Sequence, residues 1–136
     1  MRIRRGGAAM RGLIVGLTIC LIPVRAHAEC WGSSWRDEAP APTDKPDEII
    51  CMSSATEGIV RESFMFGTGV EGCNKVTATH DGEAVTFAVD YSKCTNDSPS
   101  HTVACKSLGD INQCVWTFTD GDFAGKSSTG FLVRIK

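Results

Sequence analysis

The sequence predicts a mainly β protein of the α+β class. We expect an antiparallel β meander, or curled sheet, with one short helix and disulfide staples. Apolar side chains recur at every second position from residue 73 onward, which is the period of a strand. Asp-Gly pairs at 81–82 and 120–121 separate these stretches, as tight turns between strands do. Six cysteines follow a segment with the features of an export signal.

Residues 1–28 have the three parts of a secretory signal peptide. They are a basic start, an apolar run at 13–22 and the small-residue site Ala26-His27-Ala28. The run is shorter than the roughly 20 residues that span a bilayer. We therefore expect cleavage after Ala28, removal of Cys20, no membrane span in the mature chain, and a periplasmic or secreted location.

The six cysteines that follow the signal form an even set, which predicts three disulfides in an oxidising compartment. They are Cys30, Cys51, Cys73, Cys94, Cys105 and Cys114. Sequence alone leaves about 15 pairings open. Their spacings match neither a zinc knuckle nor a Cys-x-x-Cys redox motif, so we expect no metal and no cofactor.

Charge argues against nucleic acid as a partner. Five of the 14 basic residues lie in the signal, so 9 remain against 16 acidic residues, a formal charge of −7. Binding to phosphates needs clustered Lys and Arg, which this balance does not favour.

The mature chain divides into a short arm and one domain. Residues 29–48 contain three Pro residues and are expected to form an irregular arm, in which Trp31 and Trp35 either pin the arm to the domain or form an exposed contact surface. Residues 49–136 are long enough for a single β-rich domain.

One helix is expected, at about residues 55–66. Ser54 and Glu57 have the spacing of a capping box, and apolar residues follow at helical spacing up to Gly67, a suitable C-cap. Gly58 and the β-branched pair Ile59-Val60 favour a strand instead.

The clearest strand pair surrounds Asp81-Gly82, which is expected to form a type I′ turn. After this turn Val85, Phe87, Val89 and Tyr91 share one face. Further strands are expected to begin at Thr102 and to run, with alternating apolar residues, from Cys114 to Phe118. A short return strand is expected at Phe123, after an Asp120-Gly121 turn, and a last strand after Gly130. Strands joined by hairpins predict an antiparallel meander.

These motifs resemble a known family. The motifs are Cys51-Met52-Ser53, Gly72-Cys73 with Lys75-Val76, Gly82 with Val85 and Phe87, Cys94, and the late Gly-Asp-aromatic-x-Gly turn at 121–125. They are similar to those of the domain-of-unknown-function 3617 family of small exported proteins of Gram-negative bacteria. That resemblance covers about residues 49–136. It implies export and a β-rich fold, and it implies no activity.

Two functions are consistent with the sequence. The first is a non-enzymatic binding or interaction module of the periplasm, which would engage an envelope protein or a small apolar ligand and would need an exposed apolar patch or a cavity of a few hundred Å³. Its expected binding surface comprises Trp31, Trp35, Phe87, Tyr91, Trp116 and Phe118. The alternative is a small secreted hydrolase using His80 or His101, which would need an acidic or hydroxyl partner for that histidine in a cleft. We expect no enzyme, because no nucleophile motif is present.

Overall fold

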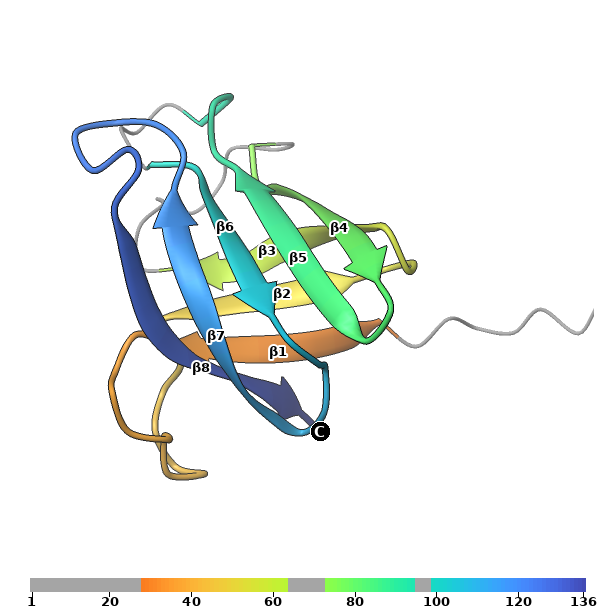
Figure 1. Ribbon diagram of the computed structural model, residues 1–136. Helices are drawn as coiled ribbons and strands as arrows, with labels where there is room; N and C mark the ends of the chain where they lie inside the picture. The colour runs from red at the N-terminus through yellow and green to blue at the C-terminus, as the bar shows by residue number, and fades with distance from the viewer. Residues whose placement is uncertain (1–27, 64–72, 95–98) are drawn as a thin grey trace, which may run out of the picture.

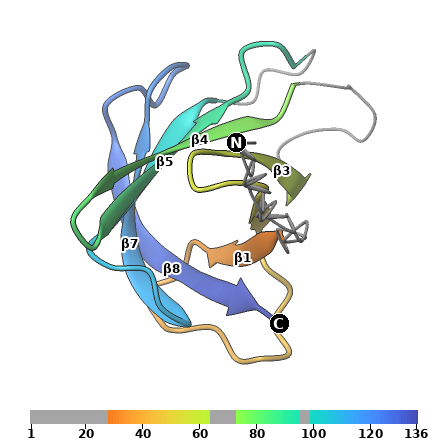
Figure 2. The ribbon, with the colours of Figure 1, turned by 90° about the vertical axis from the view of Figure 1, so that its right-hand side faces the viewer.

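The eight strands of this protein form a closed antiparallel barrel, in which each strand pairs with its neighbours in sequence and β8 pairs with β1. The computed structural model describes residues 28–63, 73–94 and 99–136. Figure 1 shows the strands from one side, and Figure 2, turned by 90°, shows them arranged around a common centre. The strands are β1 (Glu29–Ser34), β2 (Glu48–Met52), β3 (Glu57–Ser63), β4 (Lys75–Asp81), β5 (Ala84–Asp90), β6 (His101–Cys105), β7 (Ile111–Phe118) and β8 (Ser127–Ile135). No described residue belongs to a helix long and apolar enough to cross a bilayer.

The expected helix at 55–66 is wrong, because β3 occupies residues 57–63. Its side chains alternate across the sheet: Val60 is completely buried, whereas Ile59 is 48% exposed. The capping interaction does form, since Ser54 Oγ accepts a hydrogen bond from the backbone N–H of Glu57 at 3.0 Å. It closes the turn between β2 and β3 instead of starting a helix. Residues 64–66 lie outside the described part of the chain.

The expected irregular arm at 29–48 is also corrected. Residues 29–34 form β1, which pairs with both β2 and β8, and only the stretch from residue 35 to 47 lacks a strand. The barrel therefore begins at Glu29 and not at residue 49. The three prolines of this segment are the reason to expect an irregular arm. All three follow Ser34, so they affect only the connection between β1 and β2.

A tight hairpin joins β4 and β5, as expected, but its type and position differ. Asp81 pairs with Ala84, so the two turn residues are Gly82 and Glu83. Gly82 has φ +60°, and no described residue other than glycine has a positive φ. A positive φ at the first turn position alone is typical of a type II′ turn, not type I′.

The late hairpin between β7 and β8 is longer than expected. Phe123 belongs to a run of turns and not to a return strand, and Gly130 lies inside β8 instead of preceding it. Gly121 and Gly125 have φ of +75° and +83°, which folds the loop back on itself. The backbone N–H of Gly125 then donates to the carbonyl of Phe118 at 2.8 Å and closes the loop.

Alternation along the strands fills the barrel with one apolar cluster. Val85, Phe87, Val89 and Tyr91 share one face, as the sequence predicts, and the structure shows that this face points inward. The cluster comprises Trp31, Ile50, Met52, Val60, Val76, Ala78, Val85, Phe87, Val89, Tyr91, Val103, Cys105, Cys114, Trp116 and Leu132.

Three disulfides join strands that are neighbours in the barrel, which confirms the number expected and selects one pairing. The bridges are Cys30–Cys51, Cys73–Cys94 and Cys105–Cys114. The first and third connect residues that lie directly opposite in the β1–β2 and β6–β7 pairs. Each closes a short loop, with sequence separations of 21, 21 and 9 residues. Restricting the unfolded chain in this way stabilises the fold by about 3 kcal/mol per bridge.

Substitution of Gly130 by alanine tests how closely β8 packs on the strands beside it. A Cβ atom at Gly130 would lie 2.6 Å from the carbonyl oxygen of Ser34 and 2.9 Å from the ring of Trp116. Because backbone and a buried indole cannot easily move, we expect Gly130→Ala to lower the free energy of unfolding by about 2 kcal/mol. Urea denaturation measures this change. The control is Gly109→Ala, where the nearest atom would be 3.8 Å away and the change should stay within about 0.5 kcal/mol. Equal effects at both positions would contradict the packing described.

Candidate functional site

The two ends of the barrel differ in chemistry. One end carries Trp31, Met52, Phe87 and Leu108 around a pocket of about 370 Å³, which we call the mouth. The other end contains a buried polar group made of Glu48, Tyr91 and His101, which we call the polar end.

The mouth lies where interior residues of several strands reach the rim. Trp31 comes from β1, Met52 from the end of β2, Val85 and Phe87 from β5, and Leu108 from the loop between β6 and β7. The rings of Trp31 and Phe87 lie 5.9 Å apart between centroids, and the guanidinium of Arg134 lies 5.7 Å from the centroid of Trp31. Apolar side chains therefore form most of the pocket wall, with Glu29, His80 and two serines as its polar part.

Hydrogen bonds hold the rim of the mouth in place. Ser53 Oγ donates to the carbonyl of Glu57 at 3.1 Å, within the turn between β2 and β3. Across the mouth, His80 Nε2 lies 2.6 Å from the carbonyl oxygen of Ala55, so this nitrogen carries the proton and donates. This bond ties the end of β4 to the same turn and gives the rim a fixed shape.

At the polar end Glu48 binds two partners with its two oxygens. Tyr91 donates its hydroxyl to Oε2 at 2.6 Å, and His101 Nε2 lies 3.1 Å from Oε1. The second ring nitrogen of His101, Nδ1, lies 3.3 Å from the carbonyl oxygen of Pro99. Both ring nitrogens thus face acceptors, which is the arrangement of a protonated imidazole.

The surroundings shift the pKa of two of these groups. Burial lowers the pKa of His101, but the hydrogen bond and charge of Glu48, with help from the Pro99 carbonyl and from Asp120, outweigh burial and raise it above 6.5. Burial, and then the charge of Glu48, raise the pKa of the Tyr91 hydroxyl far above its usual value. The group therefore contains a buried His101–Glu48 ion pair with a neutral tyrosine beside it.

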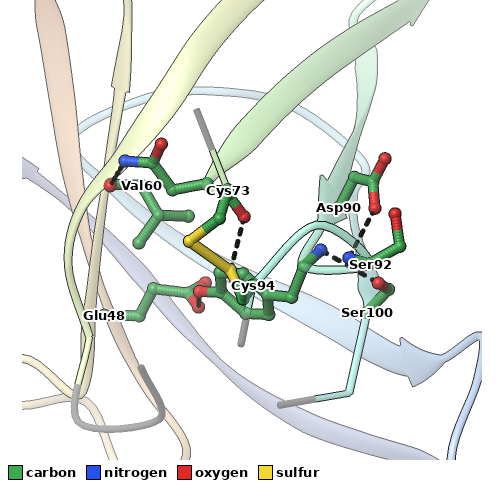
Figure 3. The surroundings of a disulfide bond; sticks show 9 residues. Glu48, Val60, Cys73, Asp90, Ser92, Cys94 and Ser100 are labelled. Atoms are coloured by element: carbon green, nitrogen blue, oxygen red, sulfur yellow. Dashed lines mark hydrogen bonds between the residues drawn. A yellow bond between two sulfur atoms is a disulfide. The ribbon is translucent and has the colours of Figure 1, made fainter. Parts of the chain in front are cut away.

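Aromatic rings and a disulfide seal this group from solvent. Trp35 and Phe118 both place their rings 6.2 Å from that of His101, edge to face. Glu48 is completely buried and His101 is 1% exposed. In Figure 3 the side chain of Glu48 points toward the Cys73–Cys94 bridge, and the segment with Ser92 and Ser100 lies on the other side. The side chains of Glu48, Tyr91 and His101 therefore form a buried plug, next to a pocket of about 400 Å³ lined mostly by polar residues.

The six aromatic residues expected to form a binding surface do not lie together on the outside. Trp31, Phe87, Tyr91 and Trp116 are buried in the core, and Trp35 and Phe118 are partly buried. Trp31 and Phe87 meet at the mouth, whereas Trp35, Tyr91 and Phe118 surround His101 at the polar end. The sequence thus supplies two residues of the mouth, and the other four have packing roles.

Neither histidine lies in an accessible catalytic arrangement. His101 has an acidic partner, as a hydrolase would need, but its ring is sealed in the plug. His80 is exposed and bonds to a backbone carbonyl. Within the described ranges, no group of three or more His, Cys, Asp and Glu side chains is placed to hold a metal ion.

Sequence reasoning missed Glu48, Met52 and Leu108. A signal for Glu48 does exist, because Glu48, Ile50 and Met52 alternate along β2 and all three are buried on the interior side. An acidic residue on the apolar face of a strand indicates a buried partner. Leu108 lies in a loop that pattern alone does not place near β1 and β5.

Comparison with protein-family models, with curated proteins and with solved structures found no match to this chain. The resemblance to the domain-of-unknown-function 3617 family stays a prediction. The class that the fold defines is a disulfide-linked, eight-stranded antiparallel barrel. Its three disulfides are compatible with an oxidising, extracellular compartment.

The ion pair at the polar end predicts how stability depends on pH. The folded-state pKa of His101 lies above its unfolded value of about 6.5, so the stabilisation is complete below that value and is lost as the pH rises through the folded pKa. We expect the free energy of unfolding to fall in this range by up to about 1.4 kcal/mol per pH unit. Urea denaturation between pH 6 and 9 measures the slope.

The titration of His101 itself provides the control. NMR of its ring protons should give a midpoint above 6.5, and Glu48→Gln should lower that midpoint. Asp110→Asn, which removes a carboxylate beside Arg134, should leave it unchanged. A midpoint below 6.5 in the native protein would refute the ion pair.

Proposed function

We propose that this chain is a small exported protein, processed after Ala28, that acts as a non-enzymatic binding module of the periplasm and takes a small apolar molecule at the mouth of its barrel. The observation that carries the proposal is the mostly apolar pocket of about 370 Å³ at one end of a barrel whose buried side chains form one apolar cluster. Small-molecule sites occur preferentially in the mouths of β-barrels, and eight strands enclose just enough room for side chains or one small ligand.

The contrast between the two ends supports this choice of site. The polar end satisfies its buried groups internally, because the polar atoms of Glu48, Tyr91 and His101 bond to one another and to the Pro99 carbonyl and offer no free partner to a ligand. The mouth instead has Trp31, Met52, Phe87 and Leu108 in the wall of its pocket, with their polar partners limited to the rim. Apolar area removed from water there would stabilise a complex by about 25 cal/mol per Å².

A small ligand fits the surface better than a large protein partner. The large hydrophobic side chains that are most exposed among the described residues, Ile59, Ile111, Val115, Phe123 and Ile135, are distributed over β3, β7, the loop after β7, and β8. The mouth, by contrast, is concave and brings its apolar groups together. Its volume suits a compound at the small end of typical ligands.

Absence of catalysis is part of the proposal. Chemistry by His101 would require its ring to reach a substrate, and the plug prevents this. At the rim, His80 is already engaged with Ala55. The three disulfides and the excess of acidic residues in the mature chain suit a stable protein in an oxidising compartment outside the cytoplasm.

Binding of a neutral fluorescent probe tests the mouth. N-phenyl-1-naphthylamine, added to protein purified after export, should bind with one site per chain and gain fluorescence. Leu108→Glu places a charge in the wall of the pocket and should weaken binding at least tenfold, about 1.4 kcal/mol. A fluorescence titration measures both constants.

The matched control is Ile111→Glu, which introduces the same charge at a residue that is 61% exposed and outside the mouth. It should leave binding unchanged. Urea denaturation of both variants establishes that each is folded. Binding that is lost equally in both variants, or in neither, would refute the mouth as the site.

A further inference from the structure

The outer wall of the barrel carries a second feature, unrelated to the mouth. Strand register places Cys30, Cys51, Ile59 and Lys75 side by side across β1, β2, β3 and β4. The residue after each of them belongs to the buried core. Because successive side chains of a strand point to opposite faces, this row of four faces outward.

A groove of about 670 Å³ lies over this row. Its floor is apolar, since it contains the Cys30–Cys51 disulfide and Ile59, which is 48% exposed. Gly58, which also lines the groove, pairs with Met52, and a Cβ atom there would collide with the Cys51 carbonyl oxygen and with Met52. An exposed isoleucine beside a disulfide is an apolar surface that solvent does not favour.

Three cations line the same groove: Arg61, Lys75 and Lys93. Glu57 is the one acidic residue among the described residues of its wall. None of the three cations forms an ion pair with a residue of the described segments. Asp90 lies opposite Lys75 in β5, and its pKa is lowered by hydrogen bonds from Ser92 and then by the charges of Lys93 and Lys75, so this carboxylate offsets part of the positive charge. Only 9 basic residues follow residue 28, against 16 acidic ones, so this local positive charge opposes the charge of the whole chain.

We propose that this groove binds a small amphipathic anion, an aliphatic chain that ends in a carboxylate. The chain would lie on Ile59 and the disulfide, and the carboxylate would meet Arg61, Lys75 and Lys93. Arg and Lys form charge-assisted hydrogen bonds to carboxylates, which are stronger than neutral ones. An anion would also reduce the mutual repulsion of the three cations.

The mouth is a poor site for such a ligand, so the two sites differ in selectivity. Among the described residues in the wall of the mouth there is no Lys or Arg, Arg134 being 5.7 Å from the centroid of the Trp31 ring, and the carboxylate of Glu29 would repel an anion. A neutral apolar molecule therefore suits the mouth, and an anionic one suits the groove. This second proposal does not depend on the first.

Processing of the chain would strengthen the groove. Ala28 lies in its wall, next to Glu29 at the start of β1. Cleavage after Ala28, which the sequence predicts, leaves a new α-amino group on Glu29, with a pKa of about 8 and hence a positive charge at neutral pH. The mature protein would then present four cations at this site.

Three probes applied to exported protein test the groove by NMR and titration calorimetry. Decanoate has both the chain and the carboxylate, decanol has the chain alone, and acetate has the carboxylate alone. We expect decanoate to bind at least tenfold more tightly than either, to shift the amide signals of Cys51, Ile59 and Lys75, and to weaken with added salt.

Variants that each remove one positive charge test whether the cations of the groove bind the carboxylate. Lys75→Gln and Arg61→Gln should each weaken decanoate binding at least fivefold, whereas Lys126→Gln, the same change outside the groove, should have no effect. Circular dichroism confirms that each variant is folded. Equal binding of decanol and decanoate, shifts confined to amides of the mouth such as Leu108, or no response to Lys75→Gln would overturn the proposal. So would binding of an acidic peptide without binding of decanoate.

Discussion

Pairing between β1 and β8 is the constraint on which the other features depend. Five residue pairs, from Cys30–Ile135 to Ser34–Phe131, join the first and last strands and close the sheet. Closure satisfies the backbone groups that an open edge would expose. It also creates an inside and two ends. Without it, Trp31 would not face Phe87, and neither the mouth nor the plug around His101 would exist.

The two ends use the enclosed space differently. A buried ion pair stabilises a protein little compared with apolar packing, because both charges lose their hydration. Its geometry is nevertheless demanding: Glu48 needs Tyr91 and His101 at hydrogen-bonding distance from three separate segments of the chain. Such a group favours one arrangement of the strands over others. The polar end therefore fixes the fold, which leaves the apolar mouth free for a ligand.

Two of the disulfides lie on opposite faces of the barrel wall. Cys105–Cys114 lies inside the core, whereas Cys30–Cys51 faces outward and forms part of the groove floor. A covalent bridge is apolar and rigid, so the outward bridge adds stability and also forms part of the surface that we propose for an anion. The structure thus assigns different roles to cysteines that look equivalent in the sequence.

The sequence by itself determined the β class, the face that Val85, Phe87, Val89 and Tyr91 share, and the number of disulfides. These follow from local period and from cysteine count, which need no knowledge of distant contacts. The local pattern failed at Ser54–Glu57, where one capping hydrogen bond suits both a helix start and a tight turn. It also failed at β1, because prolines after residue 34 concealed a strand whose partners are β2 and β8.

Only the tertiary structure decided which cysteines pair, where the barrel closes, and which side chains meet at its ends. Glu48 and His101 are 53 residues apart in sequence, and Trp31 and Phe87 belong to strands that do not pair. Contacts of this kind depend on how the whole sheet curls, and no local pattern encodes that curvature. The same holds for the groove, whose row from Cys30 to Lys75 is set by the register of four strands.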